Sequence, residues 1–205
     1  MKGKKRIIIG LIVVSLIFAS LYFDSQISRT VSEFRNETLD KFFIWITFVS
    51  SEIIIFFVLT TFLIWREKKR RWIAPLWASL GISALVSFIL KITIQRPRPF
   101  QLGLVSLLPS LQEASYSVWN FSFPSFQTML AFSAIPIISE QFPKLKYIWI
   151  GFAVLIGFSR LYFGLHFLSD VLAGGFIGCV IGMIVVYIEK DNKFGEKLYN
   201  KIRRR

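Results

Sequence analysis

Residues 159–188 read SRLYFGLHFLSDVLAGGFIGCVIGMIVVYI. The part from Phe167 to Ile188 is almost wholly apolar, with a single charged residue, Asp170, near its start. A helix needs about 20 apolar residues to cross the hydrocarbon core of a bilayer, so this run predicts a membrane-spanning helix. The only histidine of the chain, His166, stands immediately before it. A potentially reactive side chain is therefore expected where this helix enters the membrane.

Five further apolar runs of comparable length precede this one. The chain is 54% hydrophobic and 18% charged, whereas a soluble domain has about 25% charged residues. The first run lacks a convincing small-x-small cleavage site and is taken as an uncleaved span. The sequence thus predicts an all-α, polytopic membrane protein, with residues 1–205 forming one membrane domain of six transmembrane helices in a bundle. The predicted spans are 7–23, 42–65, 72–90, 123–139, 147–163 and 167–188.

The cationic residues predict the orientation of these spans. The formal net charge is +13, with 25 Lys and Arg residues, and most of these lie in the connections on one side of the predicted bundle. The positive-inside rule places that side, with both termini, in the cytoplasm of a cell whose plasma membrane holds the protein. Because membrane topology accounts for the positive charge, we expect no nucleic-acid partner. The cations predicted to face outward are Arg29, Arg35, Lys41, Lys91, Arg96, Arg98 and Arg160.

Two outward connections carry apolar residues among polar ones. Residues 24–41 fit either a helix lying on the outer membrane interface or a loop. Residues 100–122, which include Tyr116 and Trp119, fit either a partly helical lid or a loop. The single cysteine, Cys179, excludes an intramolecular disulfide and a multi-cysteine metal site, and the sequence predicts no metal and no cofactor.

Several charged residues at the outer ends of spans point to a binding site rather than to membrane anchoring. Lys91, Arg98 and Arg160 are three cations on the side that the positive-inside rule disfavours. His166 and Asp170 are four residues apart, so on one helix they would share a face and the carboxylate could hold the imidazole. These five residues together predict a site that handles phosphate at the extracytoplasmic end of the bundle.

A helix N-terminus is expected at the same end. Pro124 followed by Ser125 opens the fourth predicted span, and proline is favoured at the start of a helix. The unpaired N–H groups of such a terminus bind anions. This adds a second kind of phosphate-binding group to the three cations.

The order and spacing of these residues resemble the phosphatidic acid phosphatase type 2 superfamily of membrane lipid phosphatases. Its first motif is lysine, six residues, then Arg-Pro, and residues 91–99 match it. Its third motif is Ser-Arg, five residues, histidine, three residues and aspartate, which residues 159–170 match. Its second motif, Pro-Ser-Gly-His, is degenerate here and reads Pro124-Ser125-Phe126-Gln127. The resemblance covers residues 40–188.

The resemblance implies roles for the matching residues. His166 is implied to be the catalytic nucleophile, which forms a phosphohistidine that water then hydrolyses. Asp170 is implied to orient the imidazole and to stabilise its charged form. The implied phosphate-binding groups are the side chains of Lys91, Arg98, Arg160 and Ser125, with the backbone N–H of Phe126.

Gln127 occupies the position of the family's proton-donating catalytic histidine and cannot donate a proton in that way. A phosphate monoester must expel an alkoxide, whereas a lipid diphosphate expels a phosphate with a pKa of about 6. The sequence therefore favours hydrolysis of an isoprenoid diphosphate of the undecaprenyl type. The alternatives left open are a phosphatidate or phosphatidylglycerophosphate phosphatase, a phosphotransferase, a catalytically impaired relative that binds lipid phosphate, and a channel or transporter. The expected partners are the lipid substrate and membrane lipids, and the sequence leaves the oligomeric state open.

Three other features have structural interpretations. Gly174, Gly178 and Gly182 recur every four residues and predict a face for close helix packing. Pro136 predicts a kink in the fourth span. Glu52, inside the second span, could relay protons, pair with Lys91 or form a structural hydrogen bond.

Overall fold

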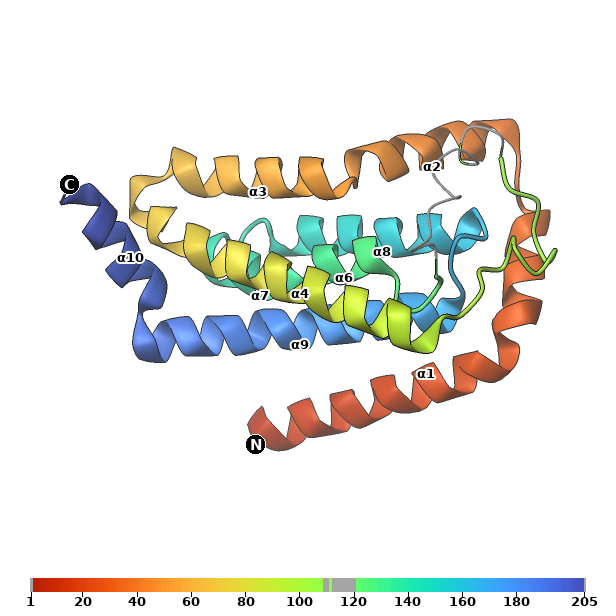
Figure 1. Cartoon of the computed structure of the whole chain (residues 1–205), viewed down its shortest axis with the longest axis horizontal. Coiled ribbons are helices and arrows are strands. Elements are labelled where there is room, and N and C mark those ends of the chain that lie inside the picture. Colours follow the sequence, from red (N-terminus) through yellow and green to blue (C-terminus); the bar gives the residue numbers. More distant parts are fainter. Residues whose placement is uncertain (1, 109–110, 112–120, 205) are drawn as a thin grey trace.

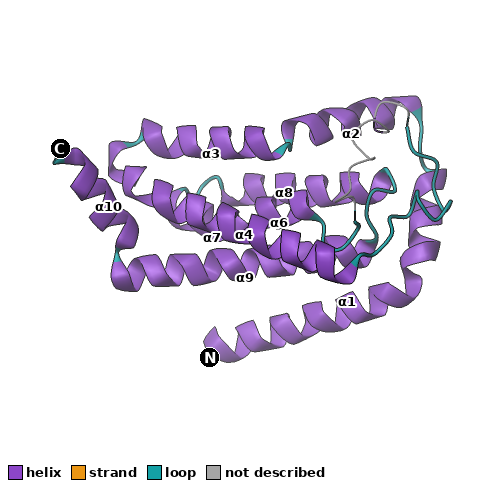
Figure 2. Cartoon of the chain, viewed as in Figure 1, coloured by secondary structure: helices purple, strands orange, loops and turns teal. Residues whose placement is uncertain are grey.

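The computed structural model describes residues 2–108, 111 and 121–204, and within them the chain forms helices and their connections, with no strand (Figures 1 and 2). The all-α prediction is confirmed for this part of the chain. The helices are α1 (Lys2–Glu33), α2 (Glu37–Val49), α3 (Glu52–Trp65), the 3-10 helix η1 (Glu67–Trp72), α4 (Ile73–Ile94), α6 (Phe126–Ser133), α7 (Ile135–Gln141), α8 (Lys146–Tyr162), α9 (Leu168–Asn192) and α10 (Phe194–Arg203).

Three helical segments in the described part of the chain are long and apolar enough to cross a membrane: Gly10–Glu33, Glu67–Ile94 and Leu168–Asn192. A fourth span results if α2 and α3, which are bent by 61° relative to each other, are counted as one. By length and composition the structure therefore supports three or four spans. The count of six stays a prediction.

Two predicted spans are interrupted. The run 42–65 is divided between α2 and α3 at Ser50 and Ser51, where the Ser50 hydroxyl donates to the Thr47 carbonyl at 3.0 Å. The run 123–139 is divided between α6 and α7 at Ala134. Pro136 has no N–H to continue the helical hydrogen-bond ladder, and the interruption lies two residues before it, in the span where the sequence predicted a kink.

The glycines of α9 allow α6 to approach it closely. A Cβ added at each of these three positions would collide with a backbone oxygen of the α6 segment. This confirms the predicted packing face, because only glycine lets two helix backbones come so near. The facing pairs are Gly174 with Ser125, Gly178 with Met129 and Gly182 with Ser133.

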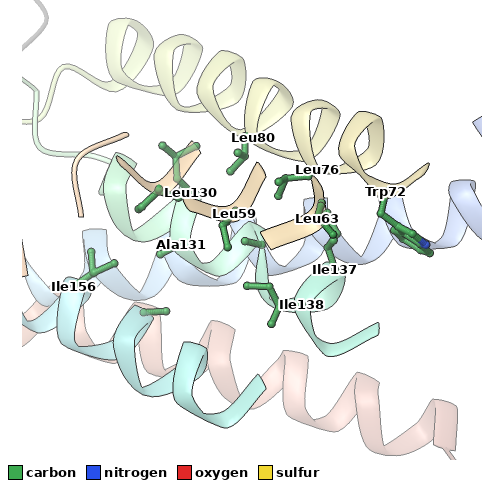
Figure 3. Close-up of a cluster of buried hydrophobic side chains, with 13 residues drawn as sticks. Leu59, Leu63, Trp72, Leu76, Leu80, Leu130, Ala131, Ile137, Ile138 and Ile156 are labelled. Atoms are coloured by element: carbon green, nitrogen blue, oxygen red, sulfur yellow. The ribbon is translucent and has the colours of Figure 1, made fainter. Parts of the chain in front are cut away.

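The largest buried apolar cluster joins α3, α4, α6, α7 and α8 (Figure 3). Its members include Leu59, Leu76, Ile137 and Ile156, and Figure 3 shows several of these side chains pointing into the space between the helices. Many large apolar side chains face outward instead; Phe57, for example, is 62% exposed. In a chain that spans a membrane, such faces contact lipid rather than water.

The two ends of the bundle differ. At one end, the connections after α4 and α8 lie near the starts of α6 and α9 (Figure 2). At the other end, α10 contacts η1 through the pair of Arg71 with Glu196 at 2.7 Å, and it contacts α9 through the Gly195 N–H, which donates to the Glu189 carboxylate at 2.7 Å. Of residues 24–41, predicted to form an interfacial helix or a loop, 24–33 continue α1 and 37–41 begin α2. Tyr116 and Trp119 of the predicted lid lie outside the described residues.

Candidate active site

His166 lies in the tight turn that joins α8 to α9. Gly164 adopts a positive φ of 66° in this turn, a conformation that favours glycine. The N–H groups of Leu165 and His166 both donate to the Arg160 carbonyl, at 3.0 and 3.2 Å. The turn therefore holds His166, which is only 4% exposed, against the last turn of α8.

The hydrogen bond of His166 determines its tautomer. Its Nδ1 lies 2.6 Å from the backbone carbonyl oxygen of Ser122. A carbonyl oxygen can only accept, so Nδ1 carries the hydrogen and the lone pair of the neutral ring is on Nε2. The contact expected from the spacing of four residues is different: Asp170 Oδ2 is 3.9 Å from Nδ1, too far for a direct hydrogen bond. The spacing had suggested that Asp170 holds the imidazole directly, but the two groups make no direct hydrogen bond.

Asp170 is fully buried and is linked to the histidine through Ser122. Its Oδ2 accepts from the Ser122 hydroxyl and from the Phe167 N–H at 2.8 Å. Its Oδ1 accepts from Arg96 Nη1 at 2.6 Å. Ser122 thus connects the two groups, since its carbonyl accepts from the histidine and its hydroxyl donates to the aspartate.

The three predicted phosphate-binding cations gather around the histidine. Burial lowers the pKa of His166 well below its usual value, and the charges of Arg98, Lys91 and Arg160 lower it further. The imidazole is therefore neutral at pH 7, as a nucleophile must be. Burial also lowers the pKa of Arg98 to about 10, which still leaves it charged at neutral pH. The ammonium of Lys91 donates to the Phe121 carbonyl beside the site.

Arg160 has capacity for another acceptor. Its residue is 3% exposed, and its Nε donates to the Ser159 hydroxyl at 3.2 Å. Its Nη2 atom is buried and has no hydrogen-bond partner among the described residues. Leaving a buried charged donor unpaired is costly, so this nitrogen is suited to an anionic oxygen. Glu52 attracts Arg160 electrostatically.

The altered second motif forms the start of α6. The Ser125 N–H donates to the Asp170 carbonyl at 3.1 Å, and its hydroxyl shares a 2.8 Å hydrogen bond with Thr128. The Phe126 side chain packs against the large apolar cluster. Gln127 follows as the second residue of the helix. The first N–H groups of a helix have no partner within it, so those of Phe126 and Gln127 are the backbone donors at this end.

Three residues in this arrangement were not predicted as site residues. Ser122 bridges His166 and Asp170, and its main role uses a backbone carbonyl, which no sequence motif marks. Arg96 was counted only as an outward cation, although it stands in the same Arg-Pro-Arg-Pro stretch as Arg98. Asp24, a charged residue at the end of an apolar run, pairs with Arg96 at 2.7 Å.

The sequence of this chain is similar to those of known proteins. The model of the PAP2 superfamily matches residues 72–194. Phosphatidylglycerophosphatase B of Bacillus subtilis is 34% identical over 129 residues, which is 57% of this chain and 58% of that protein. Undecaprenyl-diphosphatase BcrC of B. subtilis is 28% identical over 153 residues, covering 73% of this chain and 75% of that one.

Two crystal structures share the fold. LpxE of Aquifex aeolicus has a TM-score of 0.67 and 28% identity, covering 80% of this chain and 95% of that one. A PAP2-type phosphatidylglycerolphosphate phosphatase of B. subtilis has a TM-score of 0.69 and 25% identity, covering 90% and 94%. The family match spans more than half of the chain, and the motif residues at 91–98 and 159–170 fall inside it. These findings together show that the chain is a member of the PAP2 superfamily of membrane phosphatases.

Proposed function

We propose that this chain is a membrane lipid phosphatase that hydrolyses an isoprenoid diphosphate of the undecaprenyl type through a phosphohistidine at His166. The observation that carries the proposal is the state of this one histidine. It is buried, its Nδ1–H is held by the Ser122 carbonyl at 2.6 Å, and three cations surround it. A neutral imidazole with its Nε2 lone pair free is a nucleophile, and the cations supply the charge that a phosphoryl group needs.

In the first step, Nε2 attacks the terminal phosphorus, a P–N bond forms, and the bond to the bridging oxygen breaks. The lipid monophosphate leaves with the bonding electron pair. Lys91, Arg98 and Arg160 would neutralise the oxygens of the transferring group, with the buried Nη2 of Arg160 gaining its missing acceptor. The N–H of Phe126 and the start of α6, which Ser125 opens, would add backbone donors. Water then attacks the phosphohistidine, and inorganic phosphate leaves the restored imidazole.

The substrate follows from the leaving group. Gln127 cannot protonate a departing oxygen, and a general acid is worth about 10²–10⁴ in rate. An alkoxide needs that proton because its basicity approaches that of hydroxide, whose conjugate acid has a pKa of about 15.7. A phosphate leaving group, with a pKa of about 6, does not need it. The similarity to undecaprenyl-diphosphatase BcrC supports the same substrate class.

A second candidate is phosphatidylglycerophosphate. The relative called phosphatidylglycerophosphatase B shares the higher identity, 34%, although over a shorter part of this chain. Its substrate class is a phosphate monoester. A chain that lacks the acid histidine would hydrolyse a monoester slowly, so we rank this candidate second.

The proposal includes an orientation: six spans in a plasma membrane, both termini in the cytoplasm and the site facing outward. The positions of the cations support it. The basic residues of η1 and α10 lie at the end of the bundle opposite the turn that carries His166 (Figure 1). The positive-inside rule assigns the η1 and α10 end to the cytoplasm.

The test is phosphate release by the purified protein from undecaprenyl diphosphate, undecaprenyl phosphate, phosphatidate and phosphatidylglycerophosphate. We expect the diphosphate to be hydrolysed fastest, and His166→Ala to abolish turnover while the variant still inserts and folds. A matched control is Asn36→Ala, which removes a helix cap on α2 and leaves the site intact. Retention of most diphosphatase activity by His166→Ala would exclude the phosphohistidine. No turnover of any lipid would favour a catalytically impaired, lipid-phosphate-binding protein.

A further inference from the structure

A buried ion-pair network connects the first helix to the active-site aspartate. Asp24, on α1, accepts from Arg96 Nη2 at 2.7 Å. The other terminal nitrogen of Arg96, Nη1, donates to Asp170 at 2.6 Å and to the Ser169 hydroxyl at 2.7 Å. One guanidinium therefore bridges two carboxylates that come from helices far apart in the sequence.

Both carboxylates are removed from solvent. The side chain of Asp24 is 3% exposed and that of Asp170 is fully buried, while that of Arg96 is 21% exposed. Ionisable side chains within a membrane span are costly, and where they occur they usually serve a function. Asp24 lies in the candidate span Gly10–Glu33, and both of its carboxylate oxygens accept hydrogen bonds from within the protein.

Every oxygen of Asp24 is directed at the start of α9 or at Arg96. Its Oδ1 accepts from the Ser169 N–H at 3.0 Å, and its Oδ2 accepts from the Ser169 hydroxyl as well as from Arg96. Arg96 is further fixed by lying over the Phe167 ring, with Cζ 4.1 Å from its centroid. The network thus holds the residues that flank Asp170 in the first turn of α9.

We infer that Asp24 and Arg96 are positioning residues, which fix the carboxylate of Asp170 and through it the orientation of His166. The path is continuous. Asp24 holds Arg96, Arg96 holds one oxygen of Asp170, the other oxygen accepts from the Ser122 hydroxyl, and the Ser122 carbonyl holds Nδ1 of His166. Arg96 lies within the matched family region, but Asp24 precedes it, so α1 contributes a group to the site from outside residues 72–194.

The inference rests on the proposed phosphohistidine chemistry, and its test uses Asp24→Asn in the full chain. An asparagine has one acceptor oxygen, so it must place its NH₂ group against either the Ser169 N–H or Arg96, both of which are donors. In either orientation one of these donors loses its acceptor, and the negative charge that pairs with Arg96 is removed, so Arg96 is held less firmly against Asp170. Removing an outer hydrogen-bond partner of a metal ligand typically costs about 10–100-fold in activity, and by analogy we expect a fall of that size in kcat here. KM should stay unchanged because Asp24 does not touch substrate.

The matched control is Asp40→Asn, the same chemical change at a carboxylate that accepts from Tyr162 and has no link to Asp170. It should leave kcat near wild type. Equal losses of kcat in the Asp24→Asn and Asp40→Asn variants would overturn the inference. If Asp24→Asn does not fold, Ser169→Ala removes one hydroxyl of the network and keeps its charges. A smaller fall in kcat is then expected, and an unchanged kcat would overturn the inference.

A second measurement does not depend on turnover. His166 is the only histidine, so ¹⁵N labelling of histidine gives the signals of one ring. In wild type, the Nδ1 signal should be that of a protonated, hydrogen-bonded nitrogen. Asp24→Asn should shift it, and Asp40→Asn should not. An unshifted Nδ1 signal in Asp24→Asn would overturn the inference, whether or not the wild-type protein hydrolyses a lipid. Absence of lipid hydrolysis by the wild-type protein would contradict the proposed function and would leave the NMR test of the inference valid.

Discussion

Asp170→Asn tests how the buried carboxylate contributes to the chemistry. When Nε2 attacks phosphorus, the neutral imidazole acquires a positive charge, and the carboxylate of Asp170 lies 3.9 Å from Nδ1. Two unit charges at that distance interact by about 4 kcal/mol at an effective dielectric constant of about 20. Since about 1.4 kcal/mol corresponds to a tenfold change in rate, full loss of this interaction would lower kcat by about 10³-fold.

The pairing of Asp170 with Arg96 at 2.6 Å reduces the field of the carboxylate at the histidine. We therefore expect a fall in kcat of about 10²–10³-fold for Asp170→Asn, less complete than the loss in His166→Ala. KM should change little, because Asp170 is fully buried behind the histidine. The assay is phosphate release from undecaprenyl diphosphate in detergent, with thermal unfolding as the check of folding. A folded Asp170→Asn protein with kcat within about threefold of wild type would refute the electrostatic argument.

Three further predictions concern the altered motif, the protonation of the histidine and the topology. Phe126→Gly combined with Gln127→His should raise turnover of a lipid monophosphate by about 10²-fold and that of a diphosphate by much less, so equal gains on both would contradict the leaving-group argument. His166, observed by NMR as the single histidine, should stay neutral as the pH falls through about 6.5, because burial and then the charges of Arg98 and its neighbours lower its pKa. The unfolded chain binds that proton at higher pH than the native protein, so the free energy of unfolding should fall as the pH drops below about 6.5. A titration midpoint of about 6.5 for His166 in the native protein would contradict this. In a Cys179→Ala background, Thr38→Cys should react in intact cells with a membrane-impermeant thiol reagent and Lys68→Cys should not, and the opposite pattern would reverse the orientation.

The sequence predicted the parts of the site that depend on local spacing. Lys91, Arg98, Arg160 and His166 belong to two short motifs, and the structure brings their charges together around the imidazole. The role of Ser122 could not be predicted, because its carbonyl contacts a residue 44 positions away and carries no side-chain signature. The other missed contacts, such as that of Arg96 with Asp170, also join segments far apart in the chain and depend on how the helices pack.

A helix could be predicted from the sequence where an apolar run is not interrupted by a polar group. The long apolar run at 167–188 became α9, and its glycines pack as their spacing indicated. The boundaries failed where a local polar group competes with the helix, as at Ser50 and Ser51, which divide the predicted run 42–65. Hydropathy averaged over a window cannot register such a break, because two serines change the average little.

The glycine face of α9 has a consequence for genetic suppression. A Cβ at Gly178 would meet the backbone oxygen of Met129, an atom that every amino acid carries. No replacement of Met129 could therefore make room for Gly178→Ala, unlike a clash between two side chains, which a smaller partner relieves. A selection for second-site revertants of Gly178→Ala should yield the original glycine, or changes on the other helices that contact α6 and let it move as a unit. It should yield none at position 129.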